Sequence, residues 1–109
     1  MLIELTDVVT ENKSFYKEGI DFLTSKLFSS HAEVRENCAE AIDYLLDYKK
    51  VEFPTVTITA LQKLLKTDAS LKVKVAAHNT LKVRNYLPKN FKWSMIDKIK
   101  IKLTGKTLD

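Results

Sequence analysis

The stretch FYKEGIDFLTSKL at residues 15–27 has two counterparts further along the chain, FPTVTITALQKLL at 53–65 and FKWSMIDKIKIKL at 91–103. The three stretches are separated by steps of 38 residues, and each begins with phenylalanine. Three apolar positions recur in every copy: Ile20, Leu23 and Leu27; Ile58, Leu61 and Leu65; Ile96, Ile99 and Leu103. Spacings of three and four place such side chains on one stripe of a helix. The sequence therefore predicts an amphipathic helix that recurs as an internal repeat.

A second kind of segment lies between these stripes. HAEVRENCAEAI at 31–42 aligns with SLKVKVAAHNTL at 70–81, a step of 39 residues that matches Arg35 with Lys74. Small residues in both segments, such as Cys38 and Ala77, would let a neighbouring helix approach closely. We therefore expect each stripe helix to pair with a second helix, which makes the repeating unit a helical hairpin.

Helices are expected near 2–11, 14–28, 31–48, 54–66, 69–87 and 91–104. Residues suited to helix starts are Ser30 with Glu33 as a capping box, Pro54, Thr67 and Asp68, and residues suited to helix ends are Pro88 and Gly105. The run IKIKL at 99–103 alternates as a strand would, but its alignment with the other two stripes favours a helix.

The segment EVRENCAEAI resembles the second helix of a HEAT or armadillo-type repeat, in which Val-Arg is followed by two small residues and an apolar pair. KVKVAAHNTL at 72–81 is a looser copy. The resemblance covers nearly the whole chain and implies an all-α fold, an α-α superhelix of about two and a half helical-hairpin repeats. Full repeats are expected near 14–50 and 53–88, with half-repeats at 1–12 and 91–104, in a single domain spanning 1–109.

The resemblance also implies that the Val-Arg arginine braces adjacent repeats by pairing with an aspartate. Asp68 stands six residues before Lys74, whereas Ser29 stands at the matching place before Arg35. We expect Arg35 and Lys74 to be structural in this sense. Because no partner helix follows the last stripe, we also expect the chain to belong to a longer solenoid, or to bury this end in an oligomer.

Composition narrows the class of protein. The chain has 109 residues, 45% hydrophobic and 29% charged, with only two glycines and two prolines, which favours one compact all-α domain. A single cysteine cannot form an internal disulfide, so we expect an intracellular protein, cytoplasmic or nuclear. No apolar run approaches the roughly 20 residues that span a bilayer, and no membrane insertion is expected.

Catalytic and metal-binding motifs are not indicated. The sequence has no glycine-rich phosphate loop, no HExxH pattern and no nucleophile elbow. Cys38 occupies a small-residue packing position, where a buried inert thiol is expected. His31 is expected to be solvated at a helix start, and His78 to lie in a packing region. We therefore expect no enzyme and no cofactor.

Charge is distributed unevenly. Residues 1–48 hold 4 Lys/Arg and 10 Asp/Glu, a balance of −6, and residues 49–109 hold 14 Lys/Arg and 4 Asp/Glu, a balance of +10. Partner binding is predicted for Trp93 and for basic side chains of the helices expected near 69–87 and 91–104. These basic residues are Lys72, Lys74, Lys82, Arg84, Lys98 and Lys102. Trp93 either anchors a partner or packs on the preceding helix. Ion pairs from Glu33 to Lys72 and from Asp43 to Lys82 are an alternative use of the charge.

The function that these features favour is a non-catalytic scaffold or adaptor whose basic second-helix face binds a protein with an acidic surface. A nucleic-acid-binding repeat module is one alternative. Protein is preferred because half of the chain is acidic, arginine is scarce and no aromatic platform is evident among the lysines. A tubulin-binding module of the TOG type is another alternative. Its turns would be FSSHA at 28–32 and KTDAS at 66–70, and the first of them has no lysine.

Overall fold

Five helices make up the part of the chain that the structure, a computed structural model, describes: residues 13–47 and 51–104. They are α2 (Lys13–Lys26), α3 (Ala32–Leu46), α4 (Thr55–Thr67), α5 (Leu71–Lys82) and α6 (Met95–Thr104). No strand occurs in these residues, so the all-α prediction is confirmed there, and IKIKL is helical. The helix expected near 2–11 and the cap expected at Gly105 lie outside the described residues.

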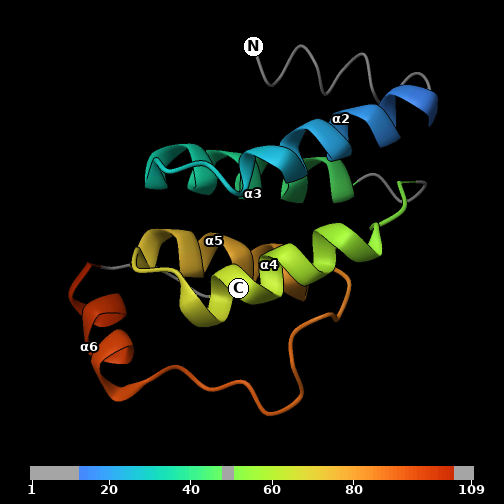
Figure 1. Cartoon of the computed structure of the whole chain (residues 1–109). Coiled ribbons are helices and arrows are strands. Elements are labelled where there is room, and N and C mark those ends of the chain that lie inside the picture. Colours follow the sequence, from blue (N-terminus) through green and yellow to red (C-terminus); the bar gives the residue numbers. More distant parts are fainter. Residues whose placement is uncertain (1–12, 48–50, 105–109) are drawn as a thin grey trace.

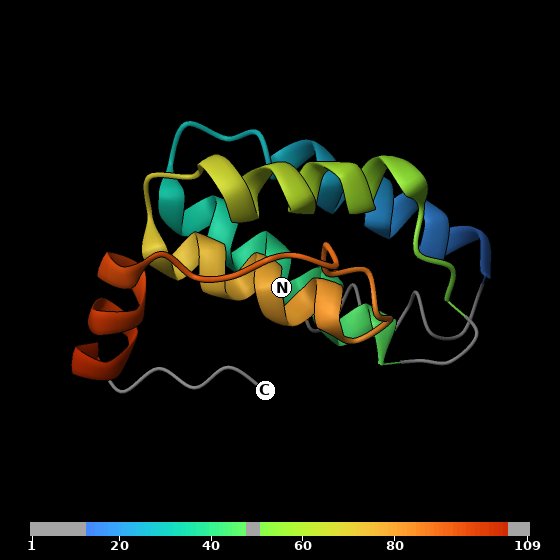
Figure 2. The ribbon, with the colours of Figure 1, turned by 90° about the horizontal axis from the view of Figure 1, so that it is seen from below.

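The first four helices form two hairpins that stack side by side. Helix α2 packs on α3, and α4 packs on α5; across the stack, α2 packs on α4 and α3 on α5. Figure 1 shows the α2–α3 hairpin above the α4–α5 hairpin, and Figure 2 shows α2 and α4 in one layer with α3 and α5 in the other. The helices of each repeat thus occupy equivalent places in the stack.

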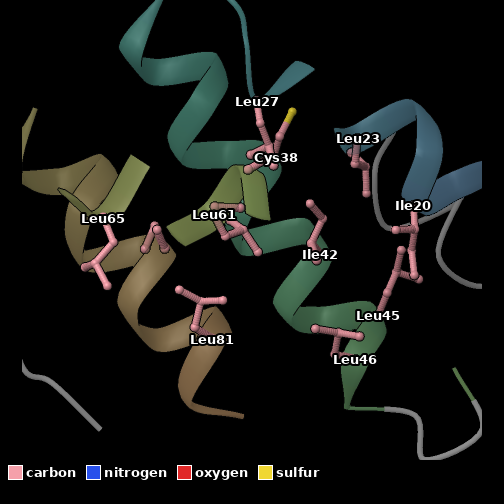
Figure 3. Close-up of a cluster of buried hydrophobic side chains, with 14 of the residues drawn as sticks. Ile20, Leu23, Leu27, Cys38, Ile42, Leu45, Leu46, Leu61, Leu65 and Leu81 are labelled. Atoms are coloured by element: carbon pink, nitrogen blue, oxygen red, sulfur yellow. The ribbon is translucent and has the colours of Figure 1, made fainter. Parts of the chain in front are cut away.

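A continuous hydrophobic core joins the two hairpins. The stripe residues of the first two copies lie in it: Leu23 of α2, Leu27 just after α2, and Leu61 and Leu65 of α4 are all fully buried. Figure 3 shows Leu61 amid side chains of the other helices. Ala39 and Ala77 are completely buried where α3 meets α5, because a small side chain permits close approach of two helices.

Three buried threonines, Thr24, Thr57 and Thr80, hold the stack in register by hydrogen bonds. The Oγ1 atoms of Thr24 in α2 and Thr57 in α4 lie 2.7 Å apart. Thr80 Oγ1 of α5 donates to the carbonyl oxygen of Ala39 in α3, at 3.0 Å. Buried polar groups need such partners, so each bond is satisfied only in one alignment of the neighbouring helices.

The third copy of the stripe is placed differently from the first two. Ile96, Ile99 and Leu103 are 66%, 52% and 81% exposed. Helix α6 lies at the end of the α4–α5 hairpin and runs across it, instead of extending either layer (Figures 1 and 2). The expectation that no partner helix covers the last stripe therefore holds for the described residues.

Two expected helix starts were wrong. Ser30 and Glu33 form no capping box: α3 starts after His31, and the Ser29 hydroxyl accepts from the His31 N–H at 3.1 Å. The N-cap of α5 is Ser70, whose hydroxyl accepts from Val73 N at 3.4 Å, rather than Thr67 or Asp68. Ser30 lies one residue before the N-cap of α3, and the Asp68 carboxylate pairs with Arg35 while it accepts from the Ser70 N–H.

The second hairpin ends earlier than expected, since α5 stops at Lys82 and not near residue 87. Asn85 adopts a left-handed φ of 63°, which asparagine tolerates better than most residues. Its N–H donates to Lys82 O at 3.2 Å, and the Tyr86 N–H donates to Leu81 O at 2.9 Å. This pair of bonds is a Schellman motif, which terminates a helix and turns the chain.

Helix α6 begins at Met95 instead of residue 91. The Ser94 hydroxyl accepts from Asp97 N at 3.1 Å and caps the helix. Before it, the rings of Phe91 and Trp93 both lie near the His78 ring. Residues two apart point to the same side of an extended chain but not of a helix, so this shared contact excludes helical structure at 91–93.

Candidate functional site

Two adjoining cavities of about 590 Å³ each border the segment that joins α5 to α6. They share five lining residues: Pro88, Lys89, Phe91, Lys92 and Trp93. One cavity extends to the end of α4 and the start of α6, and the other extends along the end of α5. We call the two together the basic groove, because five lysines line them: Lys66, Lys74, Lys82, Lys89 and Lys92.

The groove is strongly cationic. Among its lining residues Asp97 is the one carboxylate, and its Oδ2 lies 3.1 Å from Lys74 Nζ. Lys66, Lys82, Lys89 and Lys92 are exposed to solvent around it. Several like charges along one concave surface concentrate the electric field and attract anions. The groove therefore offers a place for a negatively charged group.

An aromatic cluster lies beside these lysines. The Trp93 ring centroid is 5.3 Å from that of His78 and 5.0 Å from that of Phe91. His78 is buried, and its Nδ1 lies 3.1 Å from Asn79 Oδ1. Trp93 packs on the hydrophobic core while one side lines both cavities. Of its two expected roles, packing is confirmed, and contact with a partner remains a prediction.

Two predicted binding residues hold the fold together. Lys74 is tied to Asp97 of α6, as described above. Arg84 Nη2 donates to the carbonyl oxygens of Leu46, at 2.9 Å, and Val51, at 3.0 Å. It thereby satisfies the Leu46 carbonyl at the end of α3, which a helix leaves without an intrahelical partner, and the Val51 carbonyl beyond that end. The remaining predicted residues outside the groove are Lys72, Lys98 and Lys102, which are all exposed.

The structure thus brings together Lys74, Lys82 and Trp93, and adds three lysines that the sequence analysis did not select: Lys66, Lys89 and Lys92. A signal for two of them is present in PKNFKW at 88–93, where lysine and aromatic residues alternate. The expectation that no aromatic platform accompanies the lysines was wrong. It failed because Phe91 was assigned to the repeated core positions and both rings to a helix near 91–104, whereas Phe91 and Trp93 lie in an extended segment along the groove.

The acidic first hairpin does not neutralise this surface as the alternative interpretation required. Neither Glu33 with Lys72 nor Asp43 with Lys82 forms an ion pair among the residues that the structure describes. Instead, burial and the nearby charges of Asp47 and Glu40 raise the pKa of Asp43 to about 6. The ionised Asp43 carboxylate is therefore unfavourable in the fold, first because burial removes it from water and then because Asp47 and Glu40 repel it.

This unfavourable ionisation predicts a pH-dependent stability. The folded pKa of Asp43 lies above its ordinary value of 3.8, so folding takes up a proton between about pH 4 and 6, and ionisation at neutral pH opposes folding. We expect Asp43→Asn to raise the free energy of unfolding by about 1 kcal/mol at neutral pH, after allowance for solvent screening. The gain should grow from about pH 4 to 6 and stay constant above, as measured by urea unfolding.

Glu33→Gln is the control for this measurement, because Glu33 is an exposed carboxylate on the same helix. It should not raise the free energy of unfolding at neutral pH, because a carboxylate in the first turn of a helix is favourable. An Asp43→Asn variant whose stability matched that of the natural chain at neutral pH would contradict the assignment of an unfavourable ionisation to this carboxylate.

The remaining candidate reactive residues lie as the sequence predicted. Cys38 is buried, and burial raises the pKa of its thiol. His31 is exposed at the start of α3, far along the chain from buried His78. Within residues 13–47 and 51–104, no group of three or more His, Cys, Asp or Glu side chains is arranged to hold a metal ion.

None of the described helices combines the length and the apolar character needed to cross a bilayer. Comparison of the chain with models of known protein families, with curated proteins and with solved structures finds no match. The functional argument therefore depends on the arrangement of the groove itself.

Proposed function

We propose that this protein is a non-catalytic helical-repeat module of the HEAT or armadillo type, and that its basic groove binds an acidic segment of a partner protein. The observation that carries the proposal is the gathering of five lysines around two adjoining cavities, with one carboxylate among the lining residues. Two stacked hairpins with equivalent helix places support the superhelix of about two and a half repeats. Such stacks commonly present binding surfaces.

An acidic protein segment suits the groove because the positive charge of the groove is carried by lysine. Lysine is a flexible point charge that accepts carboxylates in many geometries, whereas planar recognition of phosphates favours arginine. The two arginines of the chain are both engaged elsewhere, Arg35 with Asp68 and Arg84 with backbone carbonyls. Acidic residues of the first hairpin would also repel the continuous negative charge of a polyphosphate backbone. The field between the acidic and basic hairpins would orient a protein partner so that its acidic segment faces the groove.

Single-stranded nucleic acid is the second candidate, favoured by one specific observation. Phe91 and Trp93 line the groove among its lysines, and base stacking on aromatic rings beside cations is the usual mode of single-strand binding. The two candidates differ in the ligand that should perturb Trp93 and in how binding depends on salt.

The test uses Trp93, the one tryptophan of the chain, as a fluorescent reporter in the groove. We expect an Asp/Glu-rich dodecapeptide to change its emission with saturation. Lys82→Glu, Lys89→Glu and Lys92→Glu combined should weaken binding about tenfold or more, because the field of the groove is reversed. Lys74 and Arg84 are left intact because they hold the fold.

The matched control carries the same change in charge at Lys17, Lys63 and Lys72, which are exposed and outside the groove. It should bind the peptide within about twofold of the natural chain. Equal binding by the groove variant and the natural chain would overturn the proposal. If dodecathymidylate bound more tightly than the peptide, with affinity falling steeply with salt, the nucleic-acid candidate would replace it.

A further inference from the structure

Helix α6 has two faces with different surroundings. Its inner face is attached to the rest of the molecule through Asp97, which pairs with Lys74, and through Ile101, which is buried. The opposite face carries four exposed apolar side chains: Met95, Ile96, Ile99 and Leu103. At about 100° per residue these four form one continuous stripe along the helix. The stripe is an apolar face that the described residues leave uncovered.

Lysines border this stripe on both sides. With the same angular spacing, exposed Lys98 and Lys102 lie along one edge, and Lys100 lies along the other. Apolar residues flanked by one sign of charge select a partner whose own apolar face is flanked by the opposite sign. The charge of α6 therefore indicates acidic flanks on whatever covers it.

The internal repeat indicates the shape of that partner. Positions equivalent to Ile99 and Leu103 are Leu23 and Leu27, in and just after α2, and Leu61 and Leu65 in α4. Those residues are buried beneath the second helix of their own hairpin, α3 or α5. Since α6 carries the same stripe without a second helix among the described residues, an α-helix is the element that fits it.

We propose that the exposed stripe of α6 binds an amphipathic helix of a partner protein, one whose apolar face is bordered by aspartate and glutamate. This surface is separate from the basic groove, and the inference does not depend on the proposed function. A bilayer fits less well, because interfacial helices commonly carry Trp or Phe beside Leu on the apolar face, whereas this stripe has neither ring and Trp93 packs inward. Two-fold pairing of α6 with a second copy would place like charges opposite one another.

The chain itself supplies a suitable probe. Helix α3 is the second helix of the first hairpin and is acidic. Glu33 and Glu40 are exposed along it, and Asp47 is exposed at its C-cap. A labelled peptide of residues 31–47 with Cys38→Ala reproduces its apolar stripe and its charge. The matched control peptide has all five carboxylates changed to amides, and a second control has the basic sequence of residues 70–84. Binding to the full chain is measured by fluorescence anisotropy.

We expect the acidic peptide to bind about tenfold or more tightly than either control peptide. Ile99→Asp with Leu103→Asp should abolish binding, and Lys98→Glu with Lys102→Glu should weaken it about tenfold. Lys63→Glu with Lys72→Glu is the protein control and should bind within about twofold. The groove variant at Lys82, Lys89 and Lys92 should also retain peptide binding, which separates this test from that of the proposed function.

Several results would overturn the inference. Equal binding of the acidic and amide peptides would show that charge does not select the partner. Unchanged binding by the variant with Ile99→Asp and Leu103→Asp would show that the stripe is not the binding surface. A concentration-dependent dimer in sedimentation velocity, lost in that variant, would assign the stripe to a second copy. Binding to vesicles of phosphatidylcholine and phosphatidylserine, lost in the same variant while the peptide does not bind, would assign it to a membrane surface. Circular dichroism checks folding, and the lysine variant decides the question if the aspartate variant does not fold.

Discussion

Replacing Arg35 by alanine is expected to lower the free energy of unfolding by about 3–5 kcal/mol. Arg35 Nε and Nη2 donate to Asp68 Oδ2 and Oδ1 at 2.8 and 3.0 Å, a two-pronged ion pair. Only 3% of the Asp68 side chain is exposed. Loss of the guanidinium therefore leaves a buried carboxylate without a counter-charge, which is the costly way to break such a pair.

The position of the pair adds to its effect. Arg35 lies in α3 of the first hairpin, and Asp68 follows α4 of the second. Arg35 Nη1 also donates to Ser29 O at 2.8 Å, and Asp68 Oδ1 accepts from Ser70 N at 2.9 Å at the start of α5. Hydrogen bonding to Asp68 raises the pKa of Arg35, so the charge of the guanidinium persists in the fold. One pair thus connects both inter-helix turns.

Urea unfolding followed by circular dichroism measures this prediction. Arg35→Lys is the conservative comparison: it keeps the charge but loses the planar fork, and should retain part of the stability. Lys17→Ala, at an exposed position of α2, is the control and should change stability by less than about 0.5 kcal/mol. A loss below about 1 kcal/mol for Arg35→Ala would mean that the pair behaves as an ordinary surface ion pair.

Leu65→Ala is expected to cost about 2–5 kcal/mol, because Leu65 is fully buried and its truncation leaves a cavity among close-packed neighbours. Leu27→Ala should fall in the same range, since Leu27 occupies the equivalent repeat position just after α2 and is equally buried. In a domain of this size, whose total stability is about 5–15 kcal/mol, either change removes a large share.

Leu103→Ala supplies the matched control, because the same residue type at the same repeat position is 81% exposed. Its effect on the free energy of unfolding should stay within about 0.5 kcal/mol. The three variants are compared at equal protein concentration. A cost for Leu103→Ala close to that for Leu65→Ala would show that α6 is covered in solution, and would contradict the exposure of its stripe.

Much of the fold class could be predicted from the order of apolar residues. Spacings of three and four at 20–27 and 58–65 identified α2 and α4, and the helical state of IKIKL followed from its alignment with them. Helix ends were predicted less well. The expected cap at Ser30 failed, and α5 ended at Lys82 through backbone hydrogen bonds from Asn85 and Tyr86, because several nearby residues can serve as caps and spacing does not select among them.

The candidate site could be predicted only in part. Lysines were expected on α5 and α6, and Lys82 is indeed in the groove, but Lys66, Lys89 and Lys92 come from the end of α4 and from the connecting segment. Their convergence depends on the path of residues 83–94 back along α5 (Figure 2). That path is set by the contacts of the Phe91 and Trp93 rings with His78. The repeat pattern had instead placed Phe91 and Trp93 in a helix.

By itself, the sequence determined the helical class, the two buried stripes and the burial of Cys38, because helix periodicity and the burial of apolar groups are set by residues near one another in the chain. Only the tertiary structure decided that Asp68 pairs with Arg35 and not with Lys74, that α6 crosses the end of the second hairpin, and that five lysines face one groove. The reason is that an ion pair or a groove depends on which helices stack and in what register, and this is settled by packing between residues that lie far apart in sequence.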